Sequence, residues 1–258
     1  MINHRITWYD TRNLFLNSVK KHIDKVDVVA DIGCGIVPMN FFRPSLHILI
    51  EPYKEYVNIL LHRHAEDKSI LVLEGSGQEM LPHFTDNSVD SVFLLDVIEH
   101  LEKEAGIELL RQAERIARRQ AVIFTPLGFM PQHAEHGETD GWGLGGTAFQ
   151  EHLSGWLPED FGEEWTFHIC ENFHQCDFRQ RQLPEPYGAM FALRTFTEKP
   201  TLPSGKIVNI RRPLPSEIAL ANVQAELEKS KAALAQTQTE LIQALHIAKV
   251  FRRLACKQ

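Results

Sequence analysis

The chain has 258 residues, of which 43% are hydrophobic and 24% charged, and its formal net charge is −7. These proportions exclude a disordered or collagen-like protein, and the length allows one large domain with a sizeable core. The negative charge argues against a nucleic-acid partner, because phosphate binding needs a positive surface. Four cysteines are too few for a disulfide scaffold. With no signal-peptide pattern and no apolar run near the roughly 20 residues of a membrane span, we expect a soluble, cytoplasmic protein.

Short apolar runs alternate with amphipathic stretches along the first half of the chain. The runs predict strands buried on both faces of a parallel sheet, and the amphipathic stretches predict helices that cover it. In chain order we expect a helix over 10–23, strands over 26–30 and 46–50, a helix over 53–66, strands over 70–73 and 92–95, a helix over 105–118 and a strand over 121–124. A short helix from Pro158 and an antiparallel pair of aromatic-rich strands, 165–169 and 189–196, should follow.

The end of the chain differs from the rest in charge and pattern. Four acidic and six basic residues over 214–258 give this end +2, which leaves −9 on the remainder. Proline, glycine and serine predict a linker over 200–215, between a domain at 1–199 and a helical tail at 216–258. The tail repeats leucine every seven residues, at Leu220, Leu227, Leu234 and Leu241. This pattern predicts a coiled-coil-like helix that joins copies of the chain or a partner helix. The alternative is a single helix lying along the first domain.

The last residues combine apolar and basic side chains. Ile247, Val250, Phe251 and Leu254 alternate with Lys249, Arg252, Arg253 and Lys257. A basic amphipathic turn of this kind can lie on an anionic membrane, so we expect peripheral contact with the inner face of the membrane as one role for it. The start of a further domain is the other.

A glycine turn follows the first predicted buried strand, in Asp31-Ile32-Gly33-Cys34-Gly35. Ligands of open α/β sheets bind beyond the carboxyl ends of the strands, and glycine allows positive φ and close approach to the backbone. The dinucleotide pattern G-x-G-x-x-G fails at Pro38, and no P-loop sequence follows. Glu51, at the end of the next strand, can accept hydrogen bonds from ribose hydroxyls. The pattern indicates a nucleoside without a pyrophosphate.

Five segments in this order resemble class I S-adenosylmethionine-dependent methyltransferases. The glycine turn with Glu51 resembles motif I and its following acidic residue. The others are residues 74–82 (third-strand segment), 87–92 (start of the fourth strand), 96–101 (Asp-Val-Ile-Glu-His-Leu, similar to D-V-L-E-H-L) and 125–126 (end of the fifth strand). The resemblance covers about 24–198. It implies an α/β fold with a Rossmann-like seven-stranded sheet and helices on both faces, and S-adenosylmethionine as the cofactor.

The resemblance also implies cofactor-binding residues. They are Asp31, Gly33, Cys34 and Gly35 beside the methionine part, Glu51 at the ribose, Ser76, Gly77 and Gln78 at the adenine, and Asp96 and Val97 beside the sulfonium. Two departures stand out. Ser76 replaces an aspartate that is usual in this segment, and the short stretch between Gly35 and Ser45 leaves room for a first crossover helix of only one or two turns.

A long irregular stretch, 128–156, concentrates histidine, glycine and tryptophan, and such loops are usually functional. Methylation of a hydroxyl requires removal of its proton, for which histidine is suited near neutral pH. We therefore take His152 and His133 as candidate catalytic bases. His136, Trp142 and Trp156 are candidate substrate residues, the tryptophans as faces on which a ring can stack. The alternative is a surface loop whose histidines and tryptophans pack locally.

Two groups of residues carry metal-ligating atoms: His133, Glu135, His136 and Asp140, and His168, Cys170, His174 and Cys176. In an extended strand the members of the second group would lie about 7 Å from their neighbours, too far apart for one tetrahedral ion. We assign no metal to either group.

These inferences lead to an expected function. We expect an S-adenosylmethionine-dependent methyltransferase that O-methylates a saccharide hydroxyl or its phosphate in bacterial surface polysaccharide synthesis, because enzymes that resemble this chain and carry a coiled coil often modify such sugars. The alternatives are methylation of a small-molecule natural product and a non-catalytic cofactor-binding scaffold.

Overall fold

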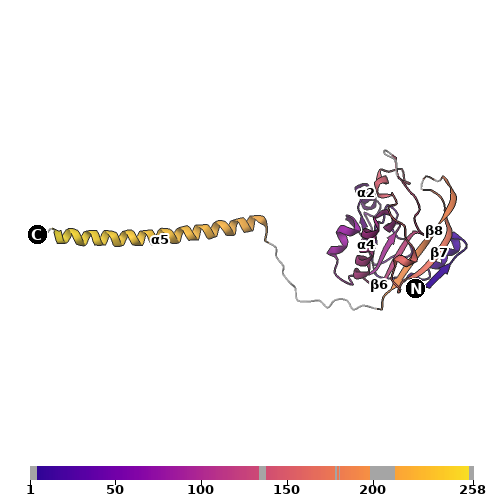
Figure 1. Ribbon diagram of the computed structural model, residues 1–258, viewed down its shortest axis with the longest axis horizontal. Helices are drawn as coiled ribbons and strands as arrows, with labels where there is room; N and C mark the ends of the chain where they lie inside the picture. Colours follow the sequence, from indigo (N-terminus) through magenta and orange to yellow (C-terminus); the bar gives the residue numbers. More distant parts are fainter. Residues whose placement is uncertain (1–4, 134–137, 178, 180, 198–212, 256–258) are drawn as a thin grey trace. The chain divides into compact units, whose positions relative to one another are not determined.

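The computed structural model describes residues 5–133, 138–177, 179, 181–197 and 213–255, with 247–255 described by their backbone alone. The chain divides into two units, Met1–Pro203 and Ser204–Gln258 (Figure 1). Most of the linker expected over 200–215 lies outside the described residues, so the domain boundaries at 199 and 216 stay predictions.

The first unit is built on one mixed sheet. Its strands are β1 (Arg5–Trp8), β2 (Val28–Ile32), β3 (Leu46–Glu51), β4 (Ile70–Glu74), β5 (Val89–Leu95), β6 (Ala117–Pro126), β7 (Thr166–Cys176) and β8 (Gln182–Thr195). They lie in the order β1-β7-β8-β6-β5-β2-β3-β4. Every neighbouring pair of strands is parallel except β8 with β6 and β8 with β7, which are antiparallel. Figure 1 shows β6, β8 and β7 side by side. The expected strands, including the late antiparallel pair, are confirmed.

The sheet has eight strands, so the expectation of seven is wrong. The additional strand is β1, which pairs in parallel with β7 from Arg5↔Thr166 to Trp8↔Ile169. All of its residues are exposed. An edge strand without buried residues lacks the apolar run that identifies a strand in a sequence.

Helices cover both faces of the sheet, as expected for this α/β fold. Successive strand residues point to opposite faces. Ala121 and Ile123 of β6 therefore join the core under α4 (Lys103–Ile116), whereas Val122 and Phe124 join the core under α1 (Arg12–Val19). Leu60 of α2 (Lys54–Arg63) packs against Leu49 of β3 on the same face as α1. The three helices confirm the predicted helices with slightly different ends.

No helix connects β2 to β3, which corrects the expectation of a helix of one or two turns. Residues 33–45 form turns and bends. The carboxylate of Asp31 accepts a hydrogen bond from the Met39 N–H at 2.7 Å, and the Arg63 guanidinium donates to the Ile36 carbonyl at 2.7 Å. Side chains thus hold a segment in which Pro38 lacks an amide donor.

The remaining short elements of the first unit are single turns. They are α3 (Gly77–Met80), η1 (Leu81–His83), η2 (Ile98–His100), η3 (Gly146–Phe149) and η4 (Pro158–Asp160). The helix expected from Pro158 is thus only one 3-10 turn.

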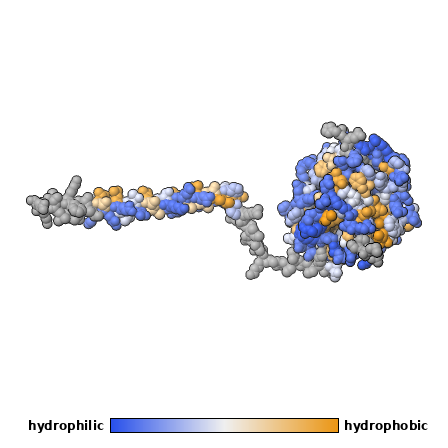
Figure 2. All heavy atoms as spheres, in the orientation of Figure 1, coloured by the Kyte–Doolittle hydropathy of each residue, from blue (hydrophilic) through white to orange (hydrophobic). Residues whose placement is uncertain are grey.

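The second unit contains the helix α5 (Pro215–Ala255), which confirms the expected long helix. The leucines of its seven-residue repeat, from Leu220 to Leu241, are 51% to 60% exposed. Figure 2 shows apolar residues beside polar ones along this helix. Its pairing as a coiled coil stays a prediction. Within the described part of the chain, no helix is long and apolar enough to cross a membrane.

Candidate active site

A cavity of about 1610 Å³ opens at the carboxyl ends of β2, β3 and β5. This is where open α/β sheets bind their ligands. Its wall is formed by the turn after β2, the end of β3, the start of α3 and the residues after β5, together with parts of α1 and β7. One continuous space therefore connects the glycine turn with the histidine-containing segments.

The glycine turn depends on backbone geometry that only glycine adopts readily. Gly33 and Gly35 have φ values of +62° and +58°. A Cβ at Gly33 would lie 3.0 Å from Cγ2 of Val97, and one at Gly35 would lie 3.0 Å from the ring of Trp142. Both positions favour glycine because they combine positive φ with close approach of a neighbour. The turn consequently presents backbone atoms to the cavity.

Glu51 lines the cavity beside the glycine turn and is only 3% exposed. Its Oε2 accepts from the Gly35 N–H and its Oε1 from the Tyr53 N–H, both at 2.9 Å. Burial raises the pKa of Glu51, and the two backbone donors oppose that rise. Each carboxylate oxygen can accept more than one hydrogen bond, so Glu51 is positioned and still able to accept from a ligand.

The residues after β5 form the middle of the cavity. Asp96 has φ +55°, an uncommon value for a residue other than glycine, and its N–H donates to the Phe124 carbonyl at 2.9 Å. Asp96 reaches solvent through the cavity, yet the surrounding protein and the neighbouring Glu99 carboxylate both raise its pKa, whereas Arg12 lowers it. Strained backbone of this kind often accompanies ligand sites.

Glu99, His100 and His152 meet at the far end of the same cavity. The Nδ1 atom of His152 lies 2.6 Å from the Met130 carbonyl oxygen. Burial lowers the pKa of His152 to about 4, and it also lowers the pKa of His100. Both imidazoles are therefore neutral near pH 7.

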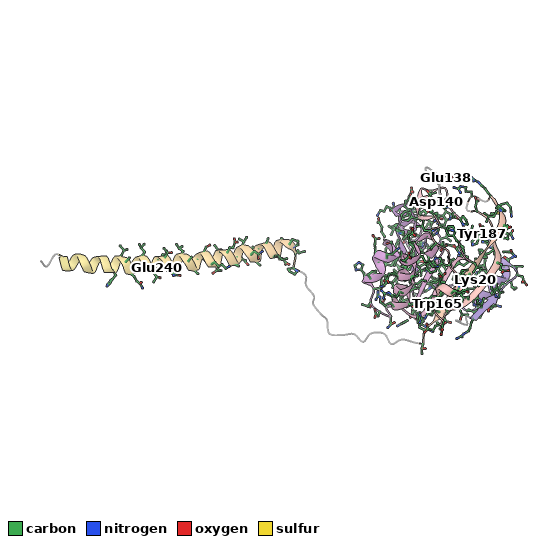
Figure 3. The ribbon with its side chains drawn as sticks, in the orientation of Figure 1. Lys20, Glu138, Asp140, Trp165, Tyr187 and Glu240 are labelled. Atoms are coloured by element: carbon green, nitrogen blue, oxygen red, sulfur yellow. The ribbon has the colours of Figure 1, made fainter. Side chains whose placement is uncertain are left out.

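Asp140 anchors the loop that covers the glycine turn. Its carboxylate accepts from the backbone N–H groups of Trp142, Leu144 and Gly146 at 2.9, 2.9 and 3.1 Å, and from the Tyr56 hydroxyl. Figure 3 shows Asp140 near one end of the first unit, far from Trp165. With its oxygens occupied by these donors, Asp140 is not available as the metal ligand considered from the sequence.

Comparison with known proteins gives a family match for part of the chain. Residues 30–125 match a family model described as a methyltransferase domain. No curated protein matches the chain. This part of the chain is therefore similar to methyltransferase domains, and the match supports S-adenosylmethionine as the cofactor.

Three solved structures are similar to this part of the chain. A putative methyltransferase from Bacillus halodurans is 10% identical with a TM-score of 0.50, over 70% of this chain and 97% of that one. The YcgJ protein from Bacillus subtilis is 11% identical with a TM-score of 0.49, over 73% and 100% of the two chains. The N-terminal domain of EvdMO1 with SAH bound is 10% identical with a TM-score of 0.46, over 70% and 79%.

The glycine end of the cavity brings together most residues that the resemblance assigns to the cofactor. Most residues assigned to the cofactor from the sequence line this space; they are Gly33, Cys34, Gly35, Glu51, Ser76, Gly77, Gln78, Asp96 and Val97. The Ser76 hydroxyl forms the hydrogen bonds of a capping box with Glu79 at the start of α3. Gln78 is therefore the polar side chain of this segment that can hydrogen-bond to a ligand. Their individual roles stay predictions.

Asp31 does not line the cavity, contrary to the expectation that it contacts the methionine part. It is buried, and its Oδ2 lies 3.2 Å from His47 Nε2 in addition to accepting from Met39. Asp31 acts as a brace beneath the turn.

The acceptor-side expectations are corrected in part. Trp156 is 0% exposed and packs in the core with its Nε1 donating to Ser154, so it cannot stack on a substrate. His133 is exposed, lies 3.0 Å from a Glu151 oxygen and is absent from the cavity lining, so the structure does not bring it to the place expected for the base. Trp142 lines the cavity beside Gly35, at the cofactor end. His152 lines the far end as expected, and His136 lies outside the described residues.

Sequence reasoning assigned no site role to three residues that line the cavity. Arg12 lies over the Phe173 ring, 4.5 Å from its centroid, and His174 has a buried Nε2 without a hydrogen-bond partner. Glu99 appeared only as a letter of the D-V-I-E-H-L segment. Arg12 comes from α1 and His174 from β7, where no motif marks them as site residues, and only tertiary contact brings them to the cavity.

Proposed function

We propose that this domain transfers a methyl group from S-adenosylmethionine to a hydroxyl oxygen of a saccharide. The observation that carries the proposal is the single cavity that joins the glycine turn and Glu51 to the buried Glu99, His100 and His152. A cofactor end and a proton-accepting end in one space suit direct transfer between bound partners, because orientation contributes much of the rate enhancement.

The cofactor end would bind the nucleoside through three elements. Glu51 would accept hydrogen bonds from the ribose hydroxyls, the turn at Gly33 and Gly35 would contact the methionine part, and Gln78 would border the adenine. Asp96 and Val97 would lie beside the sulfur. When bound, S-adenosylmethionine supplies a methyl group on a cationic sulfur; its transfer to oxygen leaves the bonding electron pair on sulfur and releases the hydroxyl proton.

The acceptor end offers a proton acceptor. A carbonyl oxygen can only accept, so the contact of Met130 O with His152 Nδ1 assigns the proton of the neutral imidazole to Nδ1. Nε2 of His152 then carries a lone pair that can take the hydroxyl proton. This supports His152, the base inferred from the sequence.

The lining supports a polyol acceptor. Amide side chains recur around the cavity, each offering a donor and an acceptor to hydroxyl groups; they are Asn13, Asn40, Gln132, Gln150, Asn172 and Gln175. The space also exceeds the roughly 300–1,000 Å³ of an ordinary small-molecule site, so it leaves room for an acceptor beside a cofactor. A saccharide of a bacterial surface polysaccharide, carrying a free hydroxyl or a phosphate, meets this description.

We further propose that α5 joins copies of the chain through its leucine repeat, and that the protein acts in the cytoplasm, with the basic C-terminal segment contacting the inner face of the membrane. The exposed leucines of α5 support self-association, because their burial would remove apolar surface from water. The backbone of residues 247–255 continues α5, so most of the basic segment is helical.

An acceptor screen tests the proposal. The full chain is incubated with labelled S-adenosylmethionine and a panel of saccharides, phosphorylated saccharides and aromatic natural products, and product methylation is measured. Label in a saccharide hydroxyl supports the proposal. Label only in aromatic compounds indicates a natural-product enzyme, and cofactor binding by calorimetry without any transfer indicates a scaffold; both outcomes contradict it.

A further inference from the structure

Three side chains with metal-ligating atoms converge where the cavity meets the core. One ligand-type atom from each of Glu99, His100 and His152 lies within 4.8 Å of the others. Glu99 and His100 come from η2, after β5, while His152 comes from the segment before Trp156. Within the described part of the chain, this is the one group that combines carboxylate, imidazole or thiolate atoms so closely.

Both imidazoles are oriented as metal-binding histidines are. His100 Nδ1 lies 3.0 Å from the Glu151 carbonyl oxygen, and His152 Nδ1 lies 2.6 Å from the Met130 carbonyl oxygen. Each carbonyl fixes a proton on Nδ1, which leaves the Nε2 lone pair free. A backbone carbonyl that accepts from the second ring nitrogen is the usual support of a histidine ligand. The two ring centroids are 5.0 Å apart.

Glu99 supplies an independent indication of a ligand. It is 2% exposed, its Oε2 accepts from the Thr125 hydroxyl at 3.0 Å, and its Oε1 is buried with no hydrogen-bond partner. A buried carboxylate oxygen without a partner is costly, and a bound cation is one of the few groups that satisfies it.

We propose that Glu99, His100 and His152 bind one divalent transition-metal cation, with open coordination positions facing the cavity. Two imidazoles and one carboxylate match the ligand sets of catalytic zinc and of non-haem iron, and they disfavour magnesium, which prefers oxygen ligands. Ligands of a tetrahedral zinc with bonds of about 2.0–2.1 Å lie about 3.4 Å apart, so ligand atoms that are now up to 4.8 Å apart need to approach by up to about 1.4 Å.

The consequence for catalysis rests on the proposed function. An acceptor hydroxyl bound at an open position would be oriented toward the cofactor end and would lose its proton more readily, because a cation stabilises negative charge on oxygen. His152 would then act as a ligand, and its lone pair would no longer take the proton. The buried Nε2 of His174, which interacts electrostatically with His152, is the nearest remaining imidazole acceptor in the lining.

Metal binding can be tested without cofactor or acceptor. The tag-free full chain is stripped with a chelator, titrated separately with Zn²⁺, Mn²⁺ and Mg²⁺ by calorimetry, and then analysed for bound metal. We expect about one equivalent of Zn²⁺ or Mn²⁺ and weaker binding of Mg²⁺. Because the chain has 13 histidines, variants must locate the site. Glu99→Gln and His152→Ala should each weaken binding about 10- to 100-fold, whereas His83→Ala, at an exposed histidine of η1, should bind as the parent does.

Two results would overturn the inference: no binding of Zn²⁺ or Mn²⁺ by the parent, or unchanged binding by folded Glu99→Gln. Glu99→Gln keeps the shape of the side chain, and circular dichroism checks its folding; Co²⁺ absorption gives a second measure of the ligand set. A failed acceptor screen with metal bound would refute the proposed function alone. Methylation of a saccharide at an undiminished rate after complete metal removal would refute the role of the cation in the reaction.

Discussion

The carboxylate of Glu51 accepts a hydrogen bond from the backbone N–H of Gly35, with 2.9 Å between Oε2 and the nitrogen. This contact ties the end of β3 to the turn after β2, two segments with no helix between them. The glycine-turn end of the cavity is thus held by the side chain that we propose binds the ribose. Removing the carboxylate should disturb both the turn and the ligand.

Glu51→Gln should bind S-adenosylmethionine about 10- to 100-fold more weakly. A hydrogen bond to a charged group contributes about 1.5–3 kcal/mol, and the amide places a donor against one of the two backbone N–H groups. Calorimetric titration measures the affinity. Glu66→Gln, at an exposed acidic residue, serves as the matched control. An unchanged affinity in Glu51→Gln would remove Glu51 from the site.

Gly33→Ala should lose more cofactor affinity than Gly143→Ala. Both glycines have positive φ, so both substitutions carry a backbone cost of about 1–2 kcal/mol. Only the Cβ at Gly33 meets a neighbour, Val97 at 3.0 Å, whereas nothing lies within 4 Å of the Cβ at Gly143. Thermal unfolding with and without S-adenosylmethionine separates stability from binding. Equal losses in the two variants would contradict a special role for the Gly33–Val97 contact.

Asp140→Asn should loosen the loop over the glycine turn and raise the KM for S-adenosylmethionine several-fold. The amide nitrogen of asparagine would face backbone N–H groups that now donate to the carboxylate. Tyr56→Phe removes the hydroxyl bond alone and should have a smaller effect. Steady-state kinetics and the fluorescence of Trp142 report the change. If Asp140→Asn left both unchanged, the loop would not depend on this anchor.

The stability of the first unit should fall as the pH is lowered from about 6.5 to about 4. Burial, followed by the nearby His22, lowers the pKa of His168 to about 4, and His168 Nδ1 contacts the Tyr9 hydroxyl at 2.7 Å. In this window the unfolded chain, with a histidine pKa near 6.5, binds a proton that the folded chain does not, so the free energy of unfolding rises with pH.

Denaturant unfolding at pH 7 and pH 5 measures this dependence. His168→Gln should reduce the change in the free energy of unfolding between about pH 6.5 and pH 4 by about 1–3 kcal/mol. His62→Gln, at an exposed histidine of α2, should keep the parental slope. A parental slope in His168→Gln would show that His168 is not responsible.

Self-association should require α5. Light scattering should give the full chain a multiple of its 29.5 kDa monomer mass and should give a chain ending at Pro213 a monomer mass. Leu227→Asp with Leu234→Asp should dissociate the oligomer, because a charge within a leucine seam is costly. Ala225→Asp with Ala232→Asp adds the same charge away from the seam and should not. Identical monomer masses for both chains would refute the proposal.

Several elements could be predicted because their signals are local. The run Val28–Ile32 is apolar, the turn after it contains glycines, and α4 repeats apolar residues at helical spacing. These patterns reflect burial on one or both sides of an element, and the spacing of apolar residues within each short stretch is enough to show it. β1 could not be predicted, since an exposed edge strand leaves no such record.

Some residues of the candidate site could likewise be predicted from the sequence, and others could not. Gly33 and Glu51 stand at the ends of neighbouring strands, so their proximity follows from the strand order. The sequence could not distinguish Trp156, which is buried in the core, from Trp142, which lies over the glycine turn, because burial depends on what packs against a residue.

The sequence by itself determined the α/β class, the cofactor and the long C-terminal helix, because periodicity and ordered motifs connect residues that are near one another along the chain. The tertiary structure alone decided that Asp31 braces the turn from beneath, that His133 lies outside the cavity lining, and that Glu99, His100 and His152 lie close together. Contacts of this kind depend on how loops pack across the sheet. They join residues far apart in the sequence, so no local pattern specifies which residues will touch.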